Sequence, residues 1–203
     1  MDPRQNESRG EEASRTLDSF PFKGEVYPPS EDTFLMAEVL EELDVKGVVL
    51  EIGVGSGYLT KIISRKAEYV VGTDISYCAI KTSKNELEKN KIVNVDLVLT
   101  DSALVFRSRS FSLIISNPPY LPCSYKEEPL WCGGQEGIEF TLRLARQSAN
   151  VMAPNGKLVF VASSLANVKK LTRLIRKFYT KVHVLKVQEV SLFEKLFILE
   201  CIV

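Results

Sequence analysis

The sequence predicts an α/β protein in which helices flank a mainly parallel β-sheet. Two observations support this fold class. Short, almost entirely apolar runs alternate with longer segments whose apolar residues recur at helical spacing, and the chemically distinctive residues follow directly after such runs. Strands buried on both faces give such runs, and strand–helix alternation favours parallel connections. Ligands in these folds bind beyond the carboxyl ends of the strands, so those ends are the candidate sites.

The first half of the chain is predicted to form three helix–strand units. Ser30 is a candidate N-cap of the first helix, with Thr33 in its first turn and apolar residues at helical spacing behind it. The run GVVLEIG is typical of a buried strand, and YVVGTD and VDLVLTD repeat the pattern. The expected helices are 30–43, 57–67 and 76–90, and the expected strands are 47–53, 69–74 and 95–101.

The second half continues the alternation and then closes with two successive strands. FSLIISN and GKLVFVA are apolar runs of strand length, with a helical segment between them and another behind the second. The expected strands are 111–117, 156–162, 182–190 and 193–202, and the expected helices are 137–152 and 164–178.

Composition and charge are those of a globular protein with one domain. The 203 residues are 45% apolar and 26% charged. Residues 1–20 are polar and mixed in charge, so a flexible tail is expected there and a single domain over 21–203. Lys plus Arg equals Asp plus Glu at 26 each, which gives no net field for nucleic acid. No apolar stretch approaches about 18 residues, so no membrane span is expected.

The cysteines argue against a zinc site in this chain. Cys78, Cys123, Cys132 and Cys201 form no C-x-x-C pair, and His183 is the single histidine. A reducing, cytoplasmic location is expected, with nuclear presence left open. A disulfide between Cys123 and Cys132 would need the loop between them to fold back, and free thiols are the favoured expectation.

A glycine-rich loop follows the first expected strand, in LEIGVGSGYLT. Gly53, Gly55 and Gly57 permit backbone angles and a close ligand approach that side chains would block. Such loops bind dinucleotides and S-adenosyl-L-methionine (AdoMet) alike, and an ordinary tight turn is the alternative. Tyr58 stands where a dinucleotide fingerprint places its third glycine. Glu51 ends the strand, and a carboxylate there suits a cationic amino-acid moiety better than a pyrophosphate.

Two more carboxylates end the next two strands. Asp74, in VVGTDIS, can accept hydrogen bonds from both hydroxyls of a ribose, a requirement that NAD and AdoMet share. Asp101, in LVLTDS, can accept from an adenine amino group. A helix cap is the alternative role for Asp101. Asp74 therefore does not distinguish the two cofactors; Glu51, the G-x-G-x-G spacing and the N-P-P-Y clamp described next together favour AdoMet over NAD.

The stretch LIISNPPYLP predicts a clamp for a planar NH2 group. An amide or aromatic amine has a delocalised lone pair, so orientation helps it more than a base does. Two acceptors, the Asn117 side-chain oxygen and the Pro118 carbonyl, can hold both N–H groups and aim the lone pair at a methyl sulfonium. Pro118 and Pro119 offer no competing N–H and stiffen the turn. Tyr120 can stack on the acceptor.

These motifs together resemble the HemK/PrmC family of protein-glutamine methyltransferases, and most of all its short eukaryotic and archaeal branch. The resemblance rests on NPPY, EIGVGSG, VYPPSEDTF (26–34) and WCGGQEG (131–137), and it covers about residues 20–200. It implies a Rossmann-like class I methyltransferase fold with a mainly parallel seven-stranded sheet whose last strand is antiparallel. The residues that it places around AdoMet are Thr33, Glu51, Gly53, Asp74, Asp101, Ser102 and Asn117, although Ser102 stands where a leucine is expected.

The activity that the resemblance implies is methylation of the glutamine side chain in the Gly-Gly-Gln motif of a class I release factor. N6-adenine methylation of DNA or RNA also uses N-P-P-Y, and protein-lysine methylation stays open as well. The zero net charge argues against direct nucleic-acid binding. A non-catalytic AdoMet-binding subunit is the third hypothesis, but such a subunit has no need of the clamp. Methyl transfer from a sulfonium requires no metal.

The resemblance also implies a protein partner. Members of the short branch pair with a small zinc-binding activator protein, which adds strands at an edge of the sheet. In this chain that edge would be residues 94–100, NVDLVLT, with one charge and no proline or lysine to protect it. A heterodimer is therefore expected.

Overall fold

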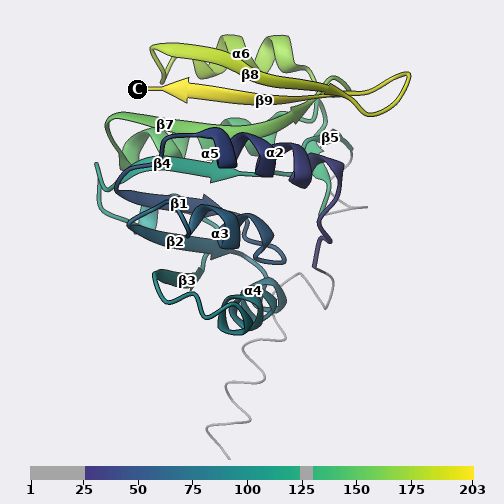
Figure 1. The fold of residues 1–203 in the computed structure, drawn as a ribbon. Coiled ribbons are helices and arrows are strands. Elements are labelled where there is room, and N and C mark those ends of the chain that lie inside the picture. The colour runs from purple at the N-terminus through teal and green to yellow at the C-terminus, as the bar shows by residue number, and fades with distance from the viewer. Residues whose placement is uncertain (1–25, 124–129) are drawn as a thin grey trace, which may run out of the picture.

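Seven strands form one central sheet, in the order β3-β2-β1-β4-β7-β9-β8, which Figure 1 shows from bottom to top. The computed structural model describes residues 26–123 and 130–203, so the expected tail over 1–20 lies outside the described residues. The sheet strands are β1 (Val48–Ile52), β2 (Tyr69–Asp74), β3 (Val95–Leu99), β4 (Phe111–Ser116), β7 (Met152–Ser163), β8 (Lys181–Glu189) and β9 (Lys195–Ile202).

Helices connect the strands and cover both faces of the sheet. They are α2 (Glu31–Glu42), α3 (Tyr58–Ile63), α4 (Tyr77–Lys89), α5 (Glu139–Val151) and α6 (Val168–Ile175), with a 3-10 helix, η1 (Ala103–Val105). The pairs β1–β2, β1–β4, β2–β3 and β4–β7 are parallel, while β9 runs antiparallel to β7 and β8. The predicted fold class, including the antiparallel last strand, is confirmed.

Alternating side chains of the central strands enter two separate cores. Val49 packs in the core beneath α2 and α3, whereas the next residue, Leu50, packs in the core beneath α5 and α6. Both side chains are fully buried. This is why β1 and β4 are mostly apolar, and why the sequence indicated buried parallel strands.

A second, two-stranded sheet was not predicted. It pairs β5 (Leu121–Pro122) with β6 (Cys132–Gly134), and these strands are too short to give a periodic signal. The pairing brings Cys123 and Cys132 together, with Cα atoms 5.5 Å apart, and the two form a disulfide. The expectation of free thiols at this pair was therefore wrong, because the chain does fold back here.

No helix within 26–123 or 130–203 is long and apolar enough to cross a membrane.

Candidate active site

A cavity of about 720 Å³ lies at the carboxyl ends of β1, β2 and β4, where the fold class predicts a ligand. Residues from the start of α2, from the loops after these strands and from α5 meet there. The predicted site residues that line it are Thr33, Glu51, Gly53, Gly55, Asp74, Asp101, Asn117, Pro118, Pro119 and Tyr120. Gly57 and Ser102 are not among its lining residues.

The loops after β1 and β2 form what we call the cofactor end of the cavity, with Glu51, Gly53, Gly55 and Asp74. Glu51 is only 1% exposed, and its Oε2 accepts a hydrogen bond from Thr60 Oγ1 at 2.5 Å. Burial raises the pKa of Glu51 to about 8, with a smaller contribution from the charge of Asp74. A cation in the cavity would stabilise the ionised form of Glu51, because opposite charge offsets the cost of burial.

Asp74 is fixed by backbone N–H groups on both of its oxygens. Oδ2 accepts from Gly55 N at 3.0 Å and Oδ1 accepts from Ser76 N at 2.8 Å. Burial raises the pKa of Asp74, while these N–H groups lower it. Gly53 has φ of 84°, and a Cβ there would meet no described atom within 4 Å. Because Gly53 lines the cavity, the room beside it belongs to the ligand.

The two predicted residues outside the cavity wall have local structural roles. Gly57 adopts φ of 80° at the start of α3, and a Cβ there would come within 3.0 Å of Ser83 Cα, so it allows α3 and α4 to pack closely. Ser102 Oγ accepts from Leu104 N at 3.2 Å and caps η1. Thus Ser102, rather than Asp101, takes the capping role that the sequence left open for Asp101.

Asp101 lies at an open part of the wall, beside α5. Its side chain is 59% exposed and lies 4.0 Å from the Arg143 guanidinium. The same guanidinium lies 5.3 Å from the centroid of the Phe140 ring. Phe140 and Arg143 both line the cavity, and the sequence analysis did not identify either. An aromatic ring and a carboxylate at this place suit a planar base with an amino group.

The start of α2 and the loop after β4 form what we call the acceptor end, with Asp32, Thr33, Asn117 and Tyr120. Asn117 Nδ2 donates to Thr33 Oγ1 at 3.3 Å. Asn117 Oδ1 is buried and has no hydrogen-bond partner among the described residues. A buried acceptor without a partner costs free energy, so a ligand that supplies an N–H donor is stabilised there.

Asp32 is the functional candidate that sequence reasoning missed. Its Oδ2 accepts from Tyr27 Oη at 3.0 Å and from Tyr120 Oη at 2.9 Å. Burial, followed by the charge of Asp32, raises the pKa of Tyr27 to about 12 and raises that of Tyr120 as well. An acid in the first turn of a helix is common, so nothing in the sequence set Asp32 apart. Ser30 is the N-cap residue of α2, but its side chain makes no capping bond.

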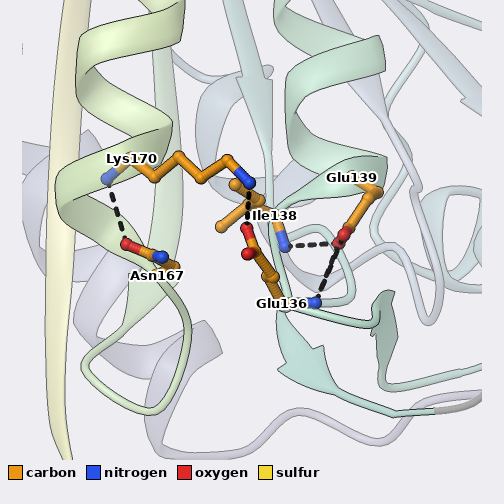
Figure 2. A network of polar contacts seen from close by, with 5 residues as sticks. All are labelled: Glu136, Ile138, Glu139, Asn167 and Lys170. Atoms are coloured by element: carbon orange, nitrogen blue, oxygen red, sulfur yellow. Dashed lines mark hydrogen bonds and ion pairs between the residues drawn. The ribbon is translucent and has the colours of Figure 1, made fainter.

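A network of polar contacts joins the loop 133–137 to the start of α5 and to α6, as Figure 2 shows. Glu139 accepts from the backbone N–H of Glu136 at 3.2 Å and of Ile138 at 3.1 Å. Lys170, on α6, binds the Glu136 carboxylate at 2.6 Å. A Cβ on Gly133 would lie 2.9 Å from the Pro119 carbonyl oxygen, so this loop and the N-P-P-Y segment are in close contact. Through Gly133, the W-x-G-G segment therefore packs against the backbone of the predicted clamp and supports it.

Within the described residues, no group of three or more His, Cys, Asp or Glu side chains is arranged to hold a metal ion.

The cofactor end fits AdoMet. The buried Glu51 carboxyl suits a cationic amino-acid group, and the half-buried Asp74 carboxyl suits a ribose. The room beside Gly53 allows a close approach, and the open wall at Asp101 suits an adenine. Asn117 lines the same cavity, and its buried side-chain oxygen has no hydrogen-bond partner among the described residues. Fold and site together define an AdoMet-dependent methyltransferase of class I.

Comparison with known proteins identifies the family. The Methyltransferase small domain family matches residues 31–192, and the chain belongs to it. A Methanocaldococcus jannaschii protein that carries the provisional name protein N5-glutamine methyltransferase is 33% identical over 168 residues, which is 79% of this chain and 83% of that protein. Methyltransferase HEMK2 of Homo sapiens is 30% identical over 169 residues, covering 75% of this chain and 78% of its own.

A solved structure agrees in fold over most of the chain. The E. cuniculi Mtq2–Trm112 complex, described as responsible for methylating the translation termination factor eRF1, contains a chain with a TM-score of 0.70 and 26% identity. The match covers 87% of this chain and 98% of that one.

Proposed function

We propose that this protein transfers the methyl group of AdoMet to the side-chain amide nitrogen of the glutamine in the Gly-Gly-Gln motif of a class I translation release factor. The observation that carries the proposal is the buried oxygen of Asn117, which lacks a donor among the described residues. A primary amide supplies that donor. The glutamine acceptor and the release factor agree with the names of the M. jannaschii relative and of the E. cuniculi complex.

The clamp orients the amide rather than deprotonating it. Asn117 Oδ1 accepts one N–H of the substrate and the Pro118 carbonyl accepts the other. Among the described residues, no backbone N–H donates to that carbonyl. With both N–H groups held, the plane of the amide is fixed, and so is the axis of the nitrogen lone pair perpendicular to it; this restriction lowers the entropic part of the barrier. Tyr120 lies beside the clamp and can cover the flat face of the amide.

When bound, AdoMet supplies the methyl group as a sulfonium carbon: the amide nitrogen forms the N–C bond, the sulfur keeps the electron pair of the broken S–C bond, and one amide proton leaves to water. The two acceptors also limit the reaction. A monomethylated amide has a single N–H, so it cannot satisfy Asn117 Oδ1 and the Pro118 carbonyl together. The expected product is therefore monomethylglutamine.

The test is incubation of the protein, alone and as a heterodimer with the activator inferred below, with isotope-labelled AdoMet and one acceptor at a time. The acceptors are an intact release factor, the same factor with Gly-Gly-Gln changed to Gly-Gly-Glu, a lysine-rich histone and adenine-containing DNA and RNA oligonucleotides. We expect label in the intact release factor alone. Label in an oligonucleotide or the histone, with none in the release factor, would overturn the proposal.

We infer further that a small zinc-binding protein pairs with β3 and completes the active enzyme. β3 is one edge of the sheet, and Asp96 is its single charged residue, whereas the opposite edge, β8, carries two lysines and a glutamate. A strand edge with few charges is a template for another strand. Val93, Leu104 and Val105, which flank β3 along the chain, are 90%, 56% and 61% exposed. The partner chain in the E. cuniculi complex supports a small protein in this role.

Co-expression of the chain with a candidate activator, followed by size-exclusion chromatography with light scattering, tests the pairing. We expect a one-to-one heterodimer, and loss of it in Val98→Lys. Val187→Lys on the opposite edge strand is the matched control and should leave the heterodimer intact. A monodisperse monomer with full activity would contradict the inference.

A further inference from the structure

Asp32 accepts more hydrogen bonds than a residue in the first turn of a helix needs. It is 4% exposed, and Oδ1 accepts from Thr33 N at 2.6 Å and Thr33 Oγ1 at 3.2 Å. Oδ2 accepts from the hydroxyls of Tyr27 and Tyr120. None of the ion pairs among the described residues includes Asp32. A buried carboxylate without a cationic partner is costly, so four converging donors indicate a role beyond starting α2.

The first consequence concerns the side-chain amide of Asn117. A threonine hydroxyl has one proton, and that of Thr33 is donated to Asp32. The Thr33 oxygen can therefore only accept, and the group of Asn117 that faces it at 3.3 Å has to be the NH2. This leaves Asn117 Oδ1 as the unpartnered atom. Asp32 thus sets which end of the amide is free for the substrate, although it does not contact Asn117.

The second consequence concerns the ring of Tyr120. Its hydroxyl donates to Asp32 at 2.9 Å, which fixes the far end of a side chain whose near end follows two prolines. The Asp32 carboxylate therefore fixes two groups: the Asn117 side-chain amide, through Thr33, and the Tyr120 ring, through its hydroxyl. Asn117 lies 84 positions after Thr33, and Tyr120 lies 88 positions after Asp32. These contacts therefore form only when the chain is folded.

We propose that Asp32 is a positioning residue for methyl transfer: through Thr33 it turns the oxygen of Asn117 toward the acceptor amide, and through Tyr120 it holds the ring that covers that amide. This role rests on the proposed function, because it concerns the same clamp. An asparagine at position 32 keeps one acceptor oxygen, so it can accept from Thr33 or from the two tyrosine hydroxyls but not from both sets. If its oxygen stays with Thr33, Tyr120 loses its acceptor. If its NH2 faces Thr33, the Thr33 proton is freed, Thr33 can donate to Asn117, and the Asn117 amide can turn its NH2 toward the substrate. A donor would then meet the donor N–H groups of the glutamine, and the substrate would lose its orientation.

The test compares Asp32→Asn with Glu31→Gln, which removes the same charge from the neighbouring, exposed position of the same turn. In Asp32→Asn we expect kcat on the release factor to fall by roughly 10- to 100-fold, with AdoMet affinity within a few-fold of wild type. Glu31→Gln should behave as wild type in both. A purely structural role would instead lower the melting temperature and AdoMet affinity while sparing kcat at saturation.

A second pair of variants keeps the test decisive if Asp32→Asn folds poorly. Thr33→Val removes the hydroxyl that links Asp32 to Asn117 and should reproduce the loss of kcat, while Thr33→Ser retains the hydroxyl and should restore most of it. In an Asn117→Ala background, Thr33→Val should add little, because both changes break one chain of contacts. Full kcat in Asp32→Asn or in Thr33→Val would overturn the proposal.

Parallel assays of wild type and Asn117→Ala separate this inference from the proposed function. If wild type, assayed as its heterodimer with the activator, does not methylate the release factor, the proposed function fails. If wild type is active, Asn117→Ala is inactive and Asp32→Asn is fully active, the positioning role alone fails. The side-chain amide NMR signals of Asn117 give an answer without turnover: they should shift in Asp32→Asn and stay in place in Glu31→Gln. Unchanged signals in Asp32→Asn would overturn the proposal whatever the substrate.

Discussion

Among the described residues, the buried carboxyl of Glu51 at the cofactor end accepts one hydrogen bond, whereas the buried carboxylate of Asp32 at the acceptor end accepts four. Both side chains are under 5% exposed. The difference fits the two ligands. With one donor among the described residues, the Glu51 carboxyl stays free to pair with a cationic group of a ligand. Asp32 orders neutral groups that have to be in place before the acceptor arrives, so its partners are built in.

Asn117→Ala should produce the largest effect and confine it to the acceptor end. We expect kcat to fall by about 100-fold or more with AdoMet affinity within a few-fold, because the lost contact orients the reacting nitrogen in the transition state. Steady-state kinetics on the release factor, with isothermal titration of AdoMet, measures both. If turnover stays near normal, Asn117 does not hold the acceptor.

Asp74→Ala should show the opposite pattern at the cofactor end. The dissociation constant of AdoMet is expected to rise by about 10- to 100-fold, since hydrogen bonds to a charged group are worth roughly 1.5–3 kcal/mol. Turnover at saturating AdoMet should change little. Asp44→Ala, at an 80% exposed side chain, is the control. Unaltered AdoMet binding in Asp74→Ala would mean that Asp74 does not bind the cofactor. The two ends of the cavity would then not have the separate roles assigned to them.

The pH dependence of the unfolding free energy tests whether the carboxyl of Glu51, at the cofactor end, is protonated in the folded apo protein. Its folded pKa of about 8 exceeds its ordinary value of 4.5, so the folded apo protein favours the protonated acid. The stability that this contributes is fully present below pH 4.5 and is lost as the pH rises through 8. Glu51→Gln cannot ionise, so urea unfolding of the two proteins between pH 5 and about 9 should diverge, with wild type losing more. Parallel curves would show that Glu51 is not held neutral.

Removal of the disulfide should have the smallest effect. Cys123→Ser with Cys132→Ser is expected to raise KM for the release factor by no more than a few-fold and to leave AdoMet binding unchanged. Two backbone hydrogen bonds, Leu121 N to Trp131 O and Cys123 N to Gly134 O, both at 2.9 Å, already join β5 to β6. Kinetics with and without a dithiol reductant measures the change. A large loss of AdoMet affinity would mean that the two ends are not independent.

The sequence predicted the sheet well because its strands are buried on both faces. β1 and β4 are apolar at nearly every position, so they were found close to their true limits. Short elements were harder: β5 and β6 are held by long-range hydrogen bonds and have no period of their own. Helix ends also shifted, since α3 ends at Ile63 and α6 begins only at Val168.

The candidate site was predicted in part for the same reason. Residues that end strands, such as Glu51, Asp74 and Asn117, could be placed because the carboxyl ends of parallel strands meet at one edge. Asp32 could not be placed in the site from the sequence, because the role that we assign to it depends on its contact with Tyr120, which lies 88 positions away in the chain. Gly57 satisfied a loop pattern, but the structure uses it for helix packing against Ser83.

The most direct measurement of the central claim is tandem mass spectrometry of the release factor after reaction with deuterium-labelled AdoMet. The two acceptors of the clamp, Asn117 Oδ1 and the Pro118 carbonyl, predict a single labelled methyl group on the side-chain nitrogen of the Gly-Gly-Gln glutamine, with no second addition at long times. A dimethylated glutamine, or a methyl group on a lysine or on a backbone nitrogen, would contradict an amide held by both of its N–H groups.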